Sequence, residues 1–428
     1  MKGWYPTAAL IRALVLGGCG LALAVALGKP SVLVLVAPLL VLAVPAVLAR
    51  PTSRPDVDVV FDHGSLVEGH ATRVRLLPTH DSDVEQVTRA TPPGEHLEAR
   101  PAHGCLVSWH GAGAEVPLEV SARRWGRRTL GEERVALTSA WAGYRWGPVQ
   151  VPGRQVLVLP SAPPLESRAE QPQPRGLVGA HRSDRPGSGT ELAGIRGFQP
   201  GDRLRRIHWA VSARTGELHV TTTRAEQDAG LLLVVDLLAE HGQSDGVDGR
   251  ESSLDITVRA AAAFAELAVH RGDRVGVRPV GGRARAVPSG AGQRHLRRVL
   301  GALADVVAGD SPYDDLTRVY LRVGAGTTVV ILSPLLADAI ATTAATLVRS
   351  GVPVVVIDTL PADFVADLGE RDPAVSALAW RMRRLEREGI TTALDAIGCP
   401  VVPWHGRGTI DDVFRSLRRR GGHSRMRA

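Results

Sequence analysis

The sequence is poor in cysteine and in lysine. Its three cysteines are Cys19, Cys105 and Cys399, and no C-x-x-C pair occurs. That pattern excludes a disulfide framework and a cysteine-rich zinc site. The only lysines are Lys2 and Lys29, so the chain has no lysine to complete a phosphate-binding GxxxxGK[ST] loop. Nearly all of its positive charge is therefore carried by arginine.

Other catalytic signatures are missing as well. The chain contains neither an HExxH nor a GxSxG motif, which removes the commonest sequence signals for a zinc protease and a serine hydrolase. The net charge is +7 and the sequence pI is near 10.0. A chain this basic favours acidic partners, and both anionic lipid and nucleic acid fit that balance.

Long apolar runs are concentrated at the N-terminus. Residues 8–28 are apolar apart from Arg12, and residues 31–49 carry no charge. Each run is about 20 residues long, enough for a helix to span the roughly 30 Å of membrane hydrocarbon. Gly28-Lys29-Pro30 leaves room only for a tight turn between them. The sequence thus predicts a transmembrane helical hairpin over 1–54.

The charges beside the hairpin predict its orientation. Four basic residues flank its outer ends and one lies at the turn; they are Lys2, Arg12, Arg50 and Arg54 at the ends and Lys29 at the turn. The positive-inside rule therefore places both ends in the cytoplasm. We expect a two-helix protein of the inner membrane with its soluble domains in the cytoplasm. A cleaved signal peptide is the competing interpretation, but a second apolar run follows at once.

Two soluble domains and a linker follow the hairpin. Over 55–160, short runs with period-two alternation, such as 57–61 and 116–120, predict an antiparallel β-sandwich. Residues 161–190 predict a flexible linker because they are rich in proline, glycine, serine and arginine.

From residue 230 the pattern changes to alternating strands and helices. Residues 231–235 form a continuous apolar run that is typical of a buried parallel strand, and 253–270 have the periodicity of a helix. Over 230–420 the sequence predicts an α/β domain with a mostly parallel sheet, and 421–428 are a basic tail. Further strands are expected over 273–280, 284–287, 327–332, 352–357 and 400–402, and further helices over 293–307, 335–349, 373–388 and 410–420.

The segment 191–229 carries the most specific pattern. Pro200-Gly201 predicts a type II turn, followed by Asp202, which can cap the next backbone amides. Turn and apolar residues are expected to fix the backbone: Phe198, Pro200, Gly201, Asp202, Ile207, Trp209 and Ser212. Arginines are expected to bind a carboxylate- or phosphate-bearing partner: Arg196, Arg203, Arg206 and Arg214. The alternative is an ordered connector in which the arginines pair with Glu191 and Asp202.

This run closely resembles the signature of the domain-of-unknown-function 58 family. The matching positions, in order, are Arg196, Phe198, Pro200-Gly201-Asp202, Arg205, Ile207, Trp209 and Ser212-Ala213-Arg214. The likeness also includes the N-terminal hairpin and a β domain with Tyr144-Arg145-Trp146-Gly147-Pro148. The resemblance implies a von Willebrand factor A-like fold after the signature. It also implies work beside a MoxR-type AAA+ ATPase in assembling or maturing other proteins.

A metal site of the von Willebrand factor A type needs Asp-x-Ser-x-Ser after the first strand, because a hard cation takes oxygen ligands. Asp236 is present, but Leu238 and Glu240 replace the serines, and Pro334 follows Ser333 where an aspartate is needed. The domain is thus expected to be degenerate, with no metal and no cofactor.

We interpret the chain as a membrane-anchored, non-catalytic scaffold or adaptor. One alternative is a membrane-bound hydrolase that uses Asp202, His208 and Asp236. Another is a binder of anionic lipid or nucleic acid, through the arginine cluster and the basic C-terminal end. The signature has too few aromatic residues to stack bases, so nucleic acid is the weaker of the two ligands.

Overall fold

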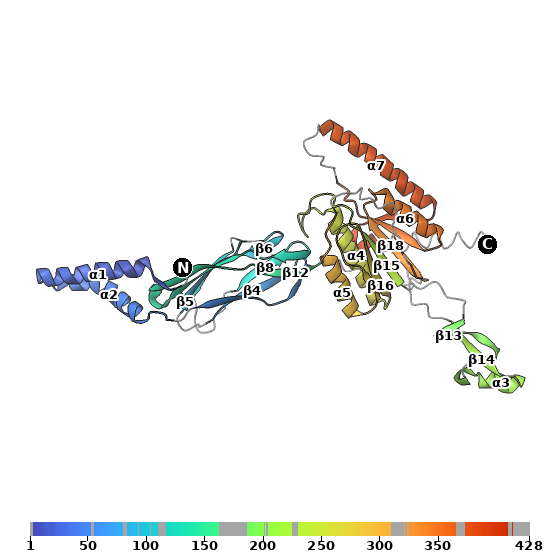
Figure 1. Cartoon of the computed structure of the whole chain (residues 1–428), viewed down its shortest axis with the longest axis horizontal. Helices are drawn as coiled ribbons and strands as arrows, with labels where there is room; N and C mark the ends of the chain where they lie inside the picture. The colour runs from blue at the N-terminus through green and yellow to red at the C-terminus, as the bar shows by residue number, and fades with distance from the viewer. Residues whose placement is uncertain are drawn as a thin grey trace. The chain divides into compact units, whose positions relative to one another are not determined.

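Figure 1 shows the computed structural model of the chain. It describes residues 3–52, 55–79, 84–92, 94–102, 104–109, 117–161, 186–200, 202, 204–224, 230–309, 321, 323–324, 326–364, 373–409 and 413. Two compact units divide the chain. One comprises Met1–Ser161 with Asp245–Arg250, and the other comprises Ala162–Ser244 with Glu251–Ala428.

The first unit begins with the predicted helical hairpin. α1 spans Ala8–Leu27 and α2 spans Ser31–Leu48, and both are long and apolar enough to cross a membrane. Gly28 closes α1 with a φ of 63°, in the left-handed region that suits glycine. The helices pack closely, because a Cβ on Gly20 would lie 2.2 Å from Val36 Cγ1.

The base of this hairpin is joined to the β domain. β1, Tyr5–Pro6, pairs antiparallel with β11, Tyr144–Val151. The Tyr5 hydroxyl donates to the Gly147 carbonyl at 2.5 Å, and the Thr7 hydroxyl donates to the Ala142 carbonyl at 2.8 Å. The sequence treated 1–54 and 55–160 as separate segments, whereas the structure places both in one unit.

The β domain is made of short strands in three sheets. Their orders are β1-β11-β10-β5-β7, β2-β4-β8-β6 and β3-β12-β9, with every pair antiparallel except β3 with β12. The strands not yet given are β2 Asp56–Phe61, β3 Ser65–Val67, β4 Ala71–Thr79, β5 Val84–Ala90, β6 Leu97–Arg100, β7 Cys105–Trp109, β8 Leu118–Ala122, β9 Gly126–Thr129, β10 Glu133–Ser139 and β12 Gln155–Leu159.

One apolar core joins the three sheets. Strand β8 illustrates the pattern, since Leu118 and Val120 are fully buried while the residues between them are not. They pack in one cluster with residues of β4, β5, β10, β11 and β12. The core also encloses an ion pair between Arg89 and Glu133, with 2.6 Å between nitrogen and oxygen.

The second unit is built on a six-stranded sheet of order β17-β16-β15-β18-β19-β20. All neighbours are parallel except β16 and β17, which confirms the predicted mostly parallel sheet. The strands are β15 Gly230–Asp236, β16 Arg274–Val280, β17 Val287–Gly290, β18 Thr327–Ser333, β19 Val354–Asp358 and β20 Val401–Pro403. The helices are α4 Ser253–His270, α5 Gln293–Ala304, α6 Asp338–Arg349 and α7 Pro373–Ala396.

Three helix boundaries differ from those expected. α5 ends at Ala304 rather than Val307, which instead forms a β-bridge with Arg283. α6 begins at Asp338 rather than Leu335, because Leu335 has a φ of 52° and cannot join a right-handed helix. α7 runs on to Ala396, past Gly389. Of the helix expected over 410–420, only Val413 lies within the described residues.

Candidate functional site

The signature segment folds as a separate small hairpin. β13, Pro186–Gly197, pairs antiparallel with β14, His219–Arg224. The connection holds a short 3-10 turn, Leu204–Arg206, and the helix α3, Trp209–Thr215. β13 begins inside the range expected to be linker, and residues 162–185 lie outside the described residues.

Asp202 closes a β-turn. It donates its backbone N–H to the Gln199 carbonyl at 3.0 Å, the hydrogen bond that joins the fourth residue of such a turn to the first. The Asp202 carboxylate in turn accepts the Gln199 N–H at 2.9 Å. Gly201 and Arg203 lie outside the described residues, so the expected positive φ and the expected partner contact there remain predictions.

Arg196 has a different role from the one expected. Both of its terminal nitrogens donate to the Asp202 carboxylate, at 2.7 Å each. This two-point ion pair braces the turn against β13, and it lowers the pKa of Asp202 and raises that of Arg196. Arg196 therefore matches the alternative of internal pairing rather than the expectation of partner binding.

Three further signature residues make contacts within the hairpin. Ile207 is buried and forms a β-bridge with Val220. The Ser212 hydroxyl is buried and accepts the His219 N–H at 2.8 Å. Phe198 donates its backbone N–H to the Leu218 carbonyl at 2.8 Å. These contacts fasten α3 and the turn to β14.

Trp209 corrects the sequence-based expectation. It was expected to anchor the backbone from within the fold, yet 68% of it is exposed. The reason lies in the length of α3: this helix of seven residues turns its one buried residue, Ser212, toward β14. Leu204, just before it, is 69% exposed. Ile195 and Leu218 of the same hairpin are exposed as well, at 42% and 46%, so the hairpin presents several large apolar side chains to solvent.

The arginines near these apolar residues differ in exposure. Arg205 and Arg214 are exposed, whereas Arg206 is half-buried. The charge of Arg206 helps to lower the pKa of Asp202, so it contributes to the brace as well as to the surface. Arg214 lies in the last turn of α3, where a cation is favourable.

His208 does not have the setting of a general base. Its Nδ1 accepts the Val211 N–H at 3.3 Å and caps the N-terminus of α3. Asp202 is paired with Arg196. Neither contact brings these two residues to Asp236, which ends β15 in a different sheet. The hydrolase alternative therefore lacks an assembled site among these three residues.

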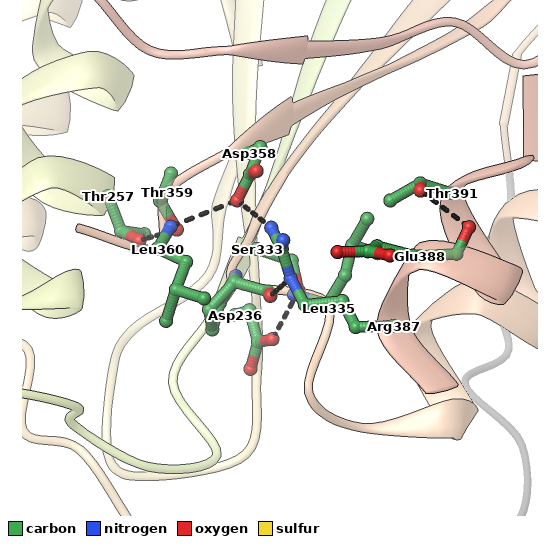
Figure 2. A network of polar contacts seen from close by, with 11 residues as sticks. Asp236, Thr257, Ser333, Leu335, Asp358, Thr359, Leu360, Arg387, Glu388 and Thr391 are labelled. Atoms are coloured by element: carbon green, nitrogen blue, oxygen red, sulfur yellow. Dashed lines mark hydrogen bonds and ion pairs between the residues drawn. The ribbon is translucent and has the colours of Figure 1, made fainter. Parts of the chain in front are cut away.

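Asp236 and Ser333 meet at the carboxyl ends of β15 and β18. The strand order reverses between these two neighbouring strands, the place where open α/β sheets bind ligands. Here the Ser333 hydroxyl donates to the Asp236 carboxylate at 2.6 Å (Figure 2). Leu238 donates its backbone N–H to the same carboxylate at 3.1 Å. Ser333 also accepts the Leu335 N–H at 2.9 Å.

Buried side chains and an ion pair surround Asp236 and Ser333. Leu238 and Leu335 are buried beside the pair. From α7, Arg387 forms an ion pair with Asp358 at the end of β19 (Figure 2) and donates to the Pro334 carbonyl at 2.8 Å. Burial raises the pKa of Asp236, although its two hydrogen bonds oppose that shift.

The described residues contain no group of three or more His, Cys, Asp or Glu side chains that could hold a metal ion. Leu238 supplies no side-chain oxygen beside Asp236, and Ser333 gives its hydroxyl to Asp236. At this edge of the sheet, the Asp236 carboxylate therefore receives its hydrogen bonds from Ser333 and Leu238.

Comparison with known proteins adds a family match. The family described as "Protein of unknown function DUF58" matches residues 194–383, which include most of the signature hairpin and most of the α/β domain. Uncharacterized protein Rv1480 of Mycobacterium tuberculosis and uncharacterized protein Mb1516 of Mycobacterium bovis are each 35% identical over 141 residues, or 33% of this chain. The chain spans 44% of the length of these relatives.

Solved structures resemble the chain only distantly. The adhesin InvE of Yersinia pseudotuberculosis is 10% identical over 24% of this chain and 32% of its own, with a TM-score of 0.17. A lipoprotein from Bacteroides thetaiotaomicron is 11% identical over 29% of this chain and 92% of its own, with a TM-score of 0.17. The cupredoxin domain of amoB from Nitrosocaldus yellowstonii is 16% identical over 28% of this chain and 97% of its own, with a TM-score of 0.15.

Proposed function

We propose that this chain is a membrane-anchored, non-catalytic scaffold that binds a partner protein through the signature hairpin. The observation that carries the proposal is the exposure of Trp209 and Leu204 on a hairpin that also presents Arg205 and Arg214. Tryptophan and arginine are the residues most enriched among those that dominate binding energy at protein interfaces. A fold that leaves them in solvent is suited to docking.

The rigidity of the hairpin supports the same function. The Arg196–Asp202 ion pair and the Ser212–His219 hydrogen bond fix the backbone beneath the exposed side chains. A preorganised surface loses less conformational entropy on binding than a flexible loop. The proposed docking surface is therefore built on a braced support.

The partner we propose is a MoxR-type AAA+ ATPase, as the family resemblance implies, with the second unit a degenerate von Willebrand factor A-like domain. The arginines of the hairpin would meet acidic groups on that partner, so binding should weaken as salt screens the charges. We propose that the soluble domains are cytoplasmic, where ATP is available to the partner.

The hydrolase and the lipid or nucleic-acid alternatives have less support. Asp236 is fully buried and hydrogen-bonded, and His208 is used as a helix cap. The predicted basic tail lies outside the described residues. The exposed Trp209 favours binding of a protein over hydrolysis and over binding of lipid or nucleic acid.

The test is binding between the purified full chain and the MoxR-type ATPase of the same genome. Trp209→Ala and Arg214→Ala should each weaken binding at least about tenfold, the effect of losing 1.4 kcal/mol or more, without lowering the melting temperature. Trp141→Ala is the matched control, because Trp141 is also exposed, at 56%, but lies in the β domain. If Trp209→Ala binds as tightly as Trp141→Ala, the hairpin is not the docking surface.

A further inference from the structure

Helix α7 has an exposed apolar stripe. Its members are 57–61% exposed: Val375, Leu378, Met382 and Leu385. Their spacing of three, four and three residues is that of alternating a and d positions in a heptad repeat. This spacing gathers the four side chains along one line of the helix surface.

The opposite face of α7 is already used within the second unit. Trp380 packs edge-on against Phe364, with 4.9 Å between ring centroids. Arg383 donates to the Leu336 carbonyl, and Arg387 donates to the Pro334 carbonyl. Further along the helix, Leu394 is buried in the core beside β19. The stripe is therefore a second apolar face, in addition to the one that packs on the domain.

We propose that this stripe pairs with the same stripe of a second copy of the chain, in a parallel two-helix contact. A parallel pair places like residues opposite one another and gives four apolar layers. An antiparallel pair centred between Leu378 and Met382 would also give four apolar layers, with Val375 against Leu385. It would set g residues beside g residues, however, and so bring the two Arg381 side chains together. A β-branched residue at a followed by leucine at d, as in Val375 and Leu378, favours a two-stranded assembly.

The charges beside the stripe fit the parallel pair. With Val375 at position a, Arg381 falls at g and Glu386 falls at e. In a parallel coiled coil the g residue of one helix lies beside the e residue five positions later on its partner. Arg381 of each copy would thus face Glu386 of the other, and the two attractions are equivalent by symmetry. Both residues are exposed.

The contact is short, so the dimer should be weak in solution. Two heptads bury less than the roughly 1,200 Å² of a stable interface. Anchoring through α1 and α2 would place the copies in one membrane with the same orientation, which raises their effective concentration without any new contact. The dimer is therefore expected in the membrane rather than in dilute detergent.

Disulfide trapping in membrane vesicles tests this proposal with the full chain. In a Cys19→Ser, Cys105→Ser background the remaining Cys399 is buried. Adding Met382→Cys should give a disulfide-linked dimer on mild oxidation. Ala377→Cys is the matched control, because Ala377 is exposed on the same helix but lies off the stripe. It should form the dimer far more slowly.

A second set of variants separates specific pairing from chance collision. Leu378→Glu added to Met382→Cys should abolish the dimer, whereas Ala377→Glu added to Met382→Cys should leave it unchanged. The proposal is wrong if Met382→Cys forms a dimer no faster than Ala377→Cys. It is also wrong if that cysteine forms no dimer and is shielded from maleimide, since another segment or protein then covers the stripe. Faster trapping between chains carrying Met382→Cys and chains carrying Leu378→Cys would overturn the parallel arrangement.

Discussion

At the scale of single residues, the buried carboxylate of Asp236 needs hydrogen bonds from its neighbours to compensate for its burial. It is buried, and its two hydrogen bonds come from Ser333 and Leu238. Burial of a charged group without compensation is costly, whereas a hydrogen-bonded one is tolerated. We interpret the Asp236–Ser333 contact as a structural tie between β15 and β18.

Removing this tie should destabilise the second unit. Asp236→Ala leaves the Ser333 hydroxyl and the Leu238 N–H without their acceptor, at about 1–3 kcal/mol for each group. Asp236→Asn keeps an acceptor for Leu238 and should cost clearly less. Thermal unfolding of the full chain in detergent measures both. Equal melting temperatures for wild type and Asp236→Ala would show that the tie carries no stability.

The stability of the wild type and that of Asp236→Asn should depend differently on pH. The folded-state pKa of Asp236 is raised, so the folded state holds its proton at a pH where the unfolded chain has lost it. The contribution of Asp236 to the free energy of unfolding should therefore decrease as the pH rises from the ordinary aspartate pKa, about 3.9, through the raised pKa. Asp236→Asn should lack this fall. A wild-type curve parallel to that of Asp236→Asn would contradict the raised pKa.

Magnesium should not stabilise the protein. A ligand at a hundred times its dissociation constant adds about 2.7 kcal/mol to the free energy of unfolding. We expect no change in the melting temperature of the full chain with millimolar magnesium, because Leu238 supplies no oxygen ligand and Ser333 is bonded to Asp236. A rise that disappears in Asp236→Asn would show a working metal site.

Two residues of the signature show where inference from sequence stops. The chain suggested that Trp209 was buried and that Arg196 was free to bind a partner. The structure exposes Trp209 and pairs Arg196 with Asp202. Residue type sets the tendency to be buried, but the position of Trp209 at the first turn of a short helix decides its exposure. The Arg196 pairing depends on a turn that brings the two residues together.

At the scale of elements, the joint between the helical hairpin and the β domain is the least expected feature. Thr7 donates its backbone N–H to the Gly143 carbonyl at 2.9 Å, and Leu10 packs with Ala43, Ala46 and Tyr144. The segment that contains Tyr144, noted in the sequence only for its family likeness, thus holds the base of both helices.

Gly143 tests this joint. A Cβ at this position would lie 2.9 Å from the Cβ of Ala46, so Gly143→Leu should push α2 away from the β domain. Hydrogen exchange should then quicken at the Thr7 amide. Gly64→Leu is the control, because a Cβ on Gly64 meets nothing within 4 Å. Unchanged exchange in Gly143→Leu would mean that the joint does not depend on this close packing.

The orientation of the hairpin rests on the charges at its ends. A topology reporter fused after Ala428 should report a cytoplasmic location, because four basic residues flank the outer ends of the hairpin and one lies at its turn. The same reporter placed after Lys29 is the matched comparison and should report the opposite side. A periplasmic signal after Ala428 would overturn both the orientation and the proposed ATPase partnership.

Element prediction succeeded where hydrophobic periodicity was strong. The helix expected over 253–270 is α4, and the apolar run over 231–235 is the centre of β15. The pattern is weaker in β5 and β10, where Arg89 and Glu133 are buried in place of apolar residues and pair with each other in the core. In the sequence each residue of a buried ion pair resembles an ordinary charged surface residue, because its partner lies far away along the chain.

At the scale of the whole molecule, the apolar helical hairpin is tied to the β domain, and the signature hairpin belongs to the unit that contains the α/β sheet. Residue pairs such as Tyr5 with Arg145 are 140 positions apart, so no local pattern predicted that the two N-terminal segments form one unit. The proposed function needs Trp209 to meet another protein in the cell.

Site-specific photocrosslinking tests this central claim most directly. A photoreactive amino acid replaces Trp209 in the full chain within living cells, and the same substitution at Trp141 serves as the control. The account predicts that position 209 crosslinks to the AAA+ ATPase, that position 141 does not, and that Arg214→Ala reduces the yield. Crosslinking of the ATPase from position 141 but not from position 209 would contradict it, as would the absence of the ATPase from both.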